Sequence, residues 1–364
     1  MTLRVAVVGY GKLGTIHARL INENPGFRLV AIIDPLEENR RDAAETLGVS
    51  TYRDVRNALN EFDCAIVATP TVFHHGVCAT LLENNKHVLV EKPIATTPAE
   101  ARNLVRLAEE KRLKLQVGHV VRFDHRFQAA AKLIQSPQLI ECTRSSGYTF
   151  RSMDIGVTLD LMIHDLDLVL SLVDSPVESV QAVGTPVIGP HEDIAHARLT
   201  FSNGAIANLT ASRVSFDQVR KLDATGRFGF VSVDFLKEDT ITALSVGPEL
   251  QSLDIDPTKL DSEQQQQISD RFFVDLLPRT ELTVKPTNAI AEEHKDFYSA
   301  ITTDRTPLVS GATGERVLDV ATRIVDTIKA GTTNEPSGIG GPHFSQDGKS
   351  VNELGIHRSN VRGL

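Results

Sequence analysis

The chain has 364 residues, a net charge of −9 and a hydrophobic content of 41%, which is typical of a globular protein large enough for two domains. Its negative charge argues against nucleic-acid binding. No apolar run approaches the roughly 20 residues that span a bilayer, and we expect no secretory signal at the N-terminus. Three scattered cysteines (Cys64, Cys78 and Cys142) lack metal-ligand spacing. Together these features predict a cytoplasmic protein without membrane or nucleic-acid partners.

The first predicted elements are a strand over 3–8, a glycine-rich turn, an amphipathic helix and a strand over 27–33. The turn has the pattern G-x-G-x-x-G at Gly9, Gly11 and Gly14. In such a turn the first glycine permits a sharp bend and the second lets the backbone approach a pyrophosphate. The third glycine lets the helix pack against the strand. Placed between a strand and a helix, this pattern predicts a dinucleotide site.

The residues around the turn add to this prediction. Lys12 and Leu13 open the helix, whose free N–H groups would face phosphate. Asp34 follows the second strand, 20 residues after the last glycine, and would accept hydrogen bonds from a ribose. Its charge would repel a 2′-phosphate, which favours NAD over NADP. Arg40 and Arg41 lie nearby in sequence and keep that preference moderate.

Strands and helices alternate up to residue 120, with further strands expected over 63–68, 88–90 and 113–117. This alternation predicts an α/β fold with a doubly wound parallel sheet. In such sheets ligands bind beyond the carboxyl ends of the strands. Residues that follow two of these strands are therefore predicted cofactor contacts: Thr69, Pro70, Thr71, His74, Glu91 and Lys92. The Lys92–Pro93 bond is expected to be cis, an isomer favoured in sharp turns at cofactor sites.

The pattern changes after residue 121. Long alternating strands appear over 179–187, 194–201 and 205–212, and Asn203–Gly204 between the last two indicates a hairpin. We therefore predict a second α/β domain over 121–330 with a large open, mostly antiparallel sheet. Residues 254–280 are predicted to be an insertion at the rim of the sheet. The polar tail over 331–364 is expected to be mobile or to form an arm onto a neighbouring subunit.

A helix predicted over 160–173 is apolar apart from a few polar residues. Asp160 and His164 are four residues apart on it and share a face. An aspartate in this position can orient the imidazole and raise its basicity, as a general base requires. A helix cap and a structural core histidine would give the same pattern. A metal site with Asp165 and Asp167 is disfavoured, because these side chains point in different directions and no second histidine cluster completes the ligand set.

The motifs, taken together, resemble those of the Gfo/Idh/MocA oxidoreductases, in the same order over residues 3–330. They are Gly9-x-Gly11-x-x-Gly14 with Asp34, Thr69-Pro70-Thr71, Glu91-Lys92-Pro93, Gly118-His119 with Arg122, and Asp160-x-x-x-His164. The resemblance implies a Rossmann domain followed by a domain that usually forms homodimers or homotetramers. It also implies that Lys92, Asp160 and His164 line the substrate cleft. Residues 148–156 resemble the members that act on nucleotide-activated amino sugars, similar to UDP-N-acetylglucosamine 3-dehydrogenases of surface polysaccharide or lipid A synthesis.

We therefore expect NAD-dependent hydride transfer from a secondary hydroxyl of a sugar, most specifically C3 of a UDP-N-acetylglucosamine-like substrate. His164 would take the hydroxyl proton, oriented by Asp160, and Lys92 would stabilise the developing negative charge. No metal is expected. Residues 111–153 carry eight Lys or Arg against two acids, and a guanidinium binds phosphate with two hydrogen bonds. The predicted substrate contacts, besides Asp160 and His164, are Arg122, Arg144, Tyr148 and Arg151.

Three alternatives stay open at this point. The substrate could be a neutral polyol such as inositol, or a free aldose. The chain could be an NAD-sensing regulator without chemistry, although the presence of both Lys92 and His164 argues against that. It could also be an epimerase or a glycosidase that retains its cofactor. The role of Glu91 is equally open, since it could pair with Lys92 or contact the cofactor ribose.

Overall fold

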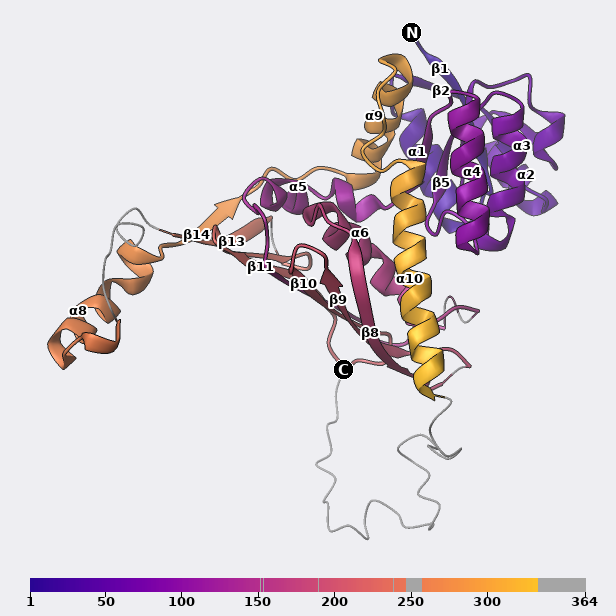
Figure 1. Cartoon of the computed structure of the whole chain (residues 1–364). Coiled ribbons are helices and arrows are strands. Elements are labelled where there is room, and N and C mark those ends of the chain that lie inside the picture. Colours follow the sequence, from indigo (N-terminus) through magenta and orange to yellow (C-terminus); the bar gives the residue numbers. More distant parts are fainter. Residues whose placement is uncertain (151, 153, 189, 238, 247–256, 333–364) are drawn as a thin grey trace, which may run out of the picture.

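A computed structural model describes residues 1–150, 152, 154–188, 190–237, 239–246 and 257–332, and the fold consists of two sheets with their helices (Figure 1). All but the first two residues of the predicted tail at 331–364 therefore lie outside the described residues. In the described part, none of the helices combines the length and the apolar character needed to span a lipid bilayer.

The first sheet has six parallel strands in the order β3-β2-β1-β4-β5-β6. These are β1 (Leu3–Val8), β2 (Phe27–Ile33), β3 (Ser50–Tyr52), β4 (Cys64–Val67), β5 (His87–Glu91) and β6 (Leu115–Gly118). The helices that connect them are α1 (Lys12–Asn22), α2 (Glu37–Leu47), α3 (His74–Glu83) and α4 (Pro98–Glu110). The order reverses at β1, and a ligand site is expected beside β1 and β4.

The ends of these elements follow from the sequence. β5 is buried from Val88 to Val90, and its charge appears only at the last residue, Glu91. A strand buried on both faces excludes charge from its interior. α4 begins with a capping box between Thr97 and Glu100, with Pro98 in the first turn. These local signals explain why the predicted elements of the first sheet form where they do.

The second sheet has eight strands in the order β14-β13-β12-β11-β7-β10-β9-β8. They are β7 (Leu139–Ser145), β8 (Val177–Thr185), β9 (Ile194–Phe201), β10 (Ile206–Ser212), β11 (Val219–Gly226), β12 (Gly229–Asp234), β13 (Thr240–Ser245) and β14 (Arg279–Thr283). Among the described strands of this second sheet, only the pair of β7 and β10 is parallel. The fold class predicted from the sequence, a parallel Rossmann sheet followed by a mostly antiparallel sheet, is confirmed.

Helices α5 (His125–Ala131) and α6 (Ile163–Leu172) lie on one face of the second sheet (Figure 1). α6 follows a π-helical turn over Thr158–Met162. Short 3₁₀ turns precede α3 and α5, over Thr71–Phe73 and Val120–Phe123. The predicted insertion at 254–280 contains α8 (Ser262–Arg271), which projects from the sheet in Figure 1. This segment leads directly into the edge strand β14.

The last two described helices connect the two sheets. α9 (Ala289–Thr302) packs against α1, and its Phe297 is buried in the cluster formed with β1 and β2. α10 (Gly311–Thr332) runs along both α4 and β8 (Figure 1). The chain therefore returns to its first domain after completing the second. α9 and all but the last two residues of α10 fall within residues 121–330, the range predicted for the second domain, and their packing places them against both domains.

Candidate active site

A cavity of about 1070 Å³ lies beyond the carboxyl ends of β1, β2 and β4. Its volume is that of a site for a cofactor-sized molecule. Seven of the residues predicted to bind the cofactor line it: Gly9, Gly11, Lys12, Leu13, Asp34, Thr69 and Pro70. The structure thus brings together the glycine turn, the acid predicted to bind the ribose and the loop after β4.

The three glycines are placed as the dinucleotide pattern requires. Gly9 has a φ of +92°, a left-handed conformation that favours glycine, and a Cβ there would meet the Ala68 carbonyl. A Cβ on Gly14 would overlap the carbonyl oxygen of Gly9, so this residue permits the close approach of α1. A Cβ on Gly11 would meet nothing within 4 Å, which leaves open space above the turn. The residues present therefore fit a pyrophosphate on the N-terminus of α1.

Asp34 is buried at the edge of this cavity. Its carboxylate accepts hydrogen bonds from the backbone N–H groups of Tyr10 (2.7 Å) and Leu36 (2.8 Å). Arg40 donates through Nη1 to the carbonyl oxygens of Asp34 (2.9 Å) and Pro35 (2.8 Å). The backbone therefore fixes the acid in place and engages the nearby arginine.

His74 and Thr71, two predicted cofactor contacts, lie in the loops around the cavity and are not among its lining residues. His74 is only 1% exposed, with Nδ1 2.8 Å from the Pro93 carbonyl and Nε2 2.8 Å from the Thr69 carbonyl. It connects the loops that follow β4 and β5. Thr71 begins the 3₁₀ turn before α3 and, like His74, is not among the cavity-lining residues. Both residues shape the loops around the cavity.

Lys92 joins the two domains at the end of β5. Its Nζ donates a 2.8 Å hydrogen bond to the Asp160 carbonyl and lies 3.8 Å from Asp160 Oδ1. The Lys92–Pro93 bond is cis, as predicted. The structure therefore brings two of the three predicted catalytic residues into direct contact, one from each domain.

Asp160 does not orient His164 in the predicted way. Among the described residues, the buried Nδ1 atom of His164 has no hydrogen-bond partner. Asp160 lies in the π-helical turn over Thr158–Met162, and its carbonyl oxygen and Oδ1 lie 2.8 and 3.8 Å from Lys92 Nζ. Burial, followed by the positive charges of Lys92 and Arg144, holds the pKa of His164 well below its usual value. The imidazole is therefore kept in the neutral form that can accept a proton.

Arg122 and Arg144 require a correction. Both are buried, and each forms a bidentate ion pair with a carboxylate of α6. Arg122 contacts Asp167 at 2.9 and 3.0 Å, and Arg144 contacts Asp165 at 2.6 and 3.0 Å. In both residues the two guanidinium N–H groups that would bind a substrate phosphate already donate to a carboxylate of α6. The basic excess seen in the sequence therefore serves, at these two positions, to hold α6 in place.

The remaining predicted substrate contacts lie after β7. Tyr148 packs edge-on against Phe150, with ring centroids 4.9 Å apart, and the Arg213 guanidinium lies over its ring at 5.8 Å. Arg151 falls outside the described residues.

The structure adds an arginine that the sequence did not single out. Arg220 pairs with Arg144 in the register of β11 and β7, and their side chains share the helix-covered face of the sheet. It is exposed, and its guanidinium pairs with no described residue. Its charge also contributes, after burial, Lys92, Arg144 and His119, to the lowered pKa of His164. No local motif marks Arg220, because only the pairing of β11 with β7 brings it to the site.

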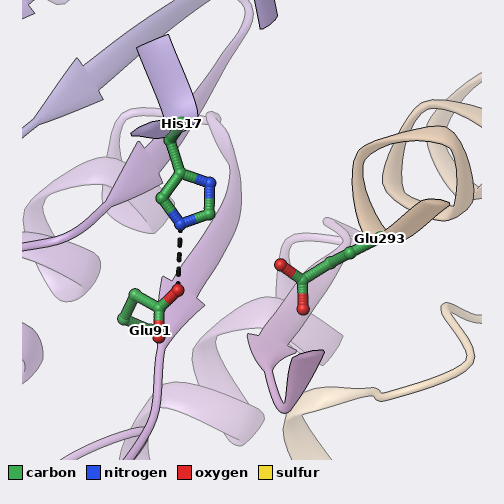
Figure 2. A group of neighbouring side chains, drawn as sticks. All are labelled: His17, Glu91 and Glu293. Carbon is green, nitrogen blue, oxygen red and sulfur yellow. Dashed lines mark hydrogen bonds and ion pairs between the residues drawn. The ribbon is translucent and has the colours of Figure 1, made fainter. Parts of the chain in front are cut away.

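Glu91 also finds a definite partner. His17, on α1, is fully buried with Nε2 2.9 Å from Glu91 Oε1 (Figure 2). The other carboxylate oxygen accepts from the Lys92 backbone N–H at 3.3 Å. Glu91 is thus engaged by α1 and by its own turn, and it is not among the residues that line the cofactor cavity. The available sequence signal was a histidine three residues after Gly14, within the first turns of the helix.

Comparison with known proteins agrees with this geometry. Residues 3–119 match a family model described as an oxidoreductase family with an NAD-binding Rossmann fold. Residues 116–231 match the GFO/IDH/MocA C-terminal domain. The chain belongs to the Gfo/Idh/MocA family of oxidoreductases, with an NAD-binding Rossmann domain at its N-terminus.

Two relatives illustrate the range of substrates in the family. The chain is 31% identical over 329 residues to UDP-N-acetylglucosamine 3-dehydrogenase of Acidithiobacillus ferrooxidans, covering 90% of this chain and 98% of the relative. A crystal structure of that enzyme aligns with a TM-score of 0.79, at 29% identity, over 91% and 99% of the two chains. The chain is also 28% identical to a scyllo-inositol 2-dehydrogenase of Bacillus subtilis, covering 67% of this chain and 77% of the relative.

Proposed function

We propose that this protein oxidises a secondary hydroxyl of a sugar with NAD as hydride acceptor. The observation that carries the proposal is the contact between Lys92, at the edge of the nucleotide-binding sheet, and Asp160, one turn before His164. The bound cofactor would supply the redox chemistry. In this arrangement Lys92 hydrogen-bonds the reacting oxygen and stabilises its developing negative charge, while His164 accepts the hydroxyl proton.

NAD is proposed over NADP on the basis of Asp34. Its carboxylate is fixed by two backbone N–H groups at the edge of the cavity, where a 2′-phosphate would meet its negative charge. Arg40, which lies near Asp34 in sequence, is held by two backbone carbonyls and is not among the residues that line the cavity.

The substrate class we propose is a nucleotide-activated amino sugar oxidised at C3, as used in surface polysaccharide or lipid A synthesis. Support comes from the likeness to the Acidithiobacillus enzyme over nearly all of its length. Arg220 supports an anionic substrate as well, because it adds a positive charge next to Arg144 on the helix-covered face of the sheet. It takes the phosphate-binding role first assigned to Arg122 and Arg144. A neutral polyol is the second candidate, favoured by the inositol dehydrogenase among the relatives.

The test is a panel of UDP-sugars, free aldoses and inositols, with NADH formation followed at 340 nm. We expect turnover of UDP-N-acetylglucosamine, and a loss of about 10²–10⁴-fold in kcat for His164→Ala and Lys92→Ala. NAD binding should persist in both variants, since neither side chain lines the cofactor cavity. Turnover of inositol alone would favour the second candidate, and normal turnover in either variant would exclude the role given to that residue. No net NADH formation with any member would favour a regulator or an enzyme that retains its cofactor.

We further propose that the protein assembles as a homodimer or homotetramer through the face of the second sheet opposite α6. That face carries a cavity of about 570 Å³ with Phe230, Leu244 and Phe273 among its lining residues. Apolar side chains on an otherwise polar face are typical of contacts between subunits.

A further inference from the structure

Behind the Glu-Lys-Pro turn lies a buried cluster of His17, Glu91 and Glu293 (Figure 2). The three residues come from α1, β5 and α9, which are distant in sequence. Each offers one ligand atom, and these atoms all lie within 4.8 Å of one another. His17 and Glu293 are fully buried, and Glu91 is 8% exposed. The proposed hydride transfer does not use this cluster.

Glu293 is the unusual member. Neither of its carboxylate oxygens has a hydrogen-bond partner among the described residues. Figure 2 shows its side chain reaching from α9 toward the His17–Glu91 pair. A buried carboxylate without a donor loses its hydration and gains nothing in return, which is costly. The neighbouring Glu91 adds a second carboxylate to the same space, so the cluster is short of positive charge.

The surroundings of His17 have the organisation of a metal-binding histidine. Metal-bound imidazoles usually donate their second N–H to a neighbouring acceptor, which fixes the tautomer. Here Nδ1 of His17 lies 2.8 Å from Nε2 of His294, so a proton on Nδ1 would leave Nε2 free to face the two carboxylates. The Glu91 side chain is 11% exposed, so one member of the cluster reaches solvent.

We propose that His17, Glu91 and Glu293 bind a divalent metal ion of the zinc or manganese class. One imidazole nitrogen and two carboxylate oxygens suit such an ion, with bonds of about 2.0–2.2 Å. Ligand atoms on a tetrahedral ion are about 3.3–3.6 Å apart, so the most widely separated pair needs to close by about 1.5 Å at most. The ion would attach α9 to the end of β5 and fix Glu91, which accepts the Lys92 backbone N–H. Its role would be structural.

The test uses the full, tag-free chain after treatment with a chelator and dialysis. We expect it to take up about one equivalent of Zn²⁺ or Mn²⁺, measured by mass spectrometry of the bound metal. The thermal unfolding midpoint should rise by several degrees on metal addition, because the ion binds only the folded chain. Co²⁺ loading should give a visible absorption band, which reports coordination independently of catalysis.

Glu293→Gln removes one ligand and keeps the shape of the side chain. We expect this variant to lose metal uptake, the thermal shift and the Co²⁺ band. Glu292→Gln is the matched control, because Glu292 is the preceding residue of α9 and forms a surface ion pair with Lys295. It should behave as the unsubstituted protein does. Should Glu293→Gln fail to fold, the metal titration of the unsubstituted chain still decides the question.

Two results would overturn the proposal. One is an unsubstituted chain that binds no stoichiometric metal and shows no thermal shift, which would mean that a proton on Glu293 satisfies the cluster. The other is metal uptake by Glu293→Gln equal to that of the unsubstituted chain, which would place the ion elsewhere.

Discussion

Individual charges set the chemistry expected at the candidate active site. His164 is surrounded by positive groups, of which Lys92 and Arg144 act most strongly after burial itself. Arg144 is neutralised by its ion pair with Asp165, whereas Arg220 has no such described partner. The site therefore combines a neutral base with a surplus of positive charge. That combination suits an oxygen that becomes negative during the reaction.

The first prediction concerns the pH dependence of kcat/KM. His164 must be neutral to accept a proton, and its pKa is held below 6.5, so activity should persist as the pH falls below 6.5. Arg220→Gln removes a nearby positive charge, which raises the pKa of His164 and moves the acidic limb to higher pH. NADH formation measured from pH 4.5 to 8 gives the position of the acidic limb in the unsubstituted enzyme and in Arg220→Gln.

The control for this experiment is Lys221→Gln. Lys221 is the next residue on β11, points to the other face of the sheet and pairs with Asp223. It should leave the pH profile unchanged. An acidic limb at or above pH 6.5 in the unsubstituted enzyme, or a downward shift in Arg220→Gln, would contradict the assignment of His164 as the base.

At the scale of elements, the junction between β1 and α1 shows two distinct uses of glycine. Gly14 lets the helix approach the strand, and Gly11 leaves room for a ligand. The two residues belong to one motif, yet the structure separates a packing role from a binding role.

Substitution by alanine should separate these roles. In Gly14→Ala the new methyl group overlaps the Gly9 carbonyl, and we expect the free energy of unfolding to fall by about 1–3 kcal/mol. In Gly11→Ala the fold should be retained, while a steric cost of about 1–3 kcal/mol against the pyrophosphate weakens NAD binding about ten- to a hundredfold. Urea unfolding and NADH fluorescence measure the two effects.

Gly331→Ala, at the exposed end of α10, provides the comparison. It should change neither stability nor cofactor affinity appreciably. Equal affinity for NAD in Gly11→Ala and the unsubstituted chain would show that the pyrophosphate does not lie above this turn.

The whole molecule is organised by the return of the chain to its first domain. Phe297 of α9 packs with β1 and β2, while Val309 and Leu318 belong to the cluster on the other side of that sheet. α10 then runs along β8 of the second sheet. Because these helices complete the first core and contact the second sheet, we expect the two domains to unfold together.

Phe297→Ala tests this arrangement. Loss of a fully buried phenylalanine should lower the free energy of unfolding by about 3–5 kcal/mol and shift one cooperative calorimetric transition of the whole chain. Phe216→Ala removes the same side chain at a fully exposed position, and its effect should stay within about 0.5 kcal/mol. Two separate transitions, with only one affected by Phe297→Ala, would show that the domains unfold independently.

Much of the fold was predictable, because its signals are local. The spacing of Gly9, Gly11 and Gly14, the acid after β2 and the abrupt charge at the end of β5 each reflect physics within a few residues. The same holds for the Asn203–Gly204 hairpin between β9 and β10. Strand and helix alternation therefore determined the α/β class and the position of the cofactor cavity.

The tertiary structure decided which charged side chains face the site and which form ion pairs in the interior. The sequence predicts Arg122 and Arg144 as phosphate contacts, but they lie opposite carboxylates of α6 and neutralise them. Asp160, in a π-helical turn that no residue pattern marks, contacts Lys92 from the other domain. Arg220 and Glu293 reach their places through strand pairing and through the return of α9. The sequence by itself determines local backbone geometry, whereas the partner of a charged side chain depends on segments that only the folded chain brings together.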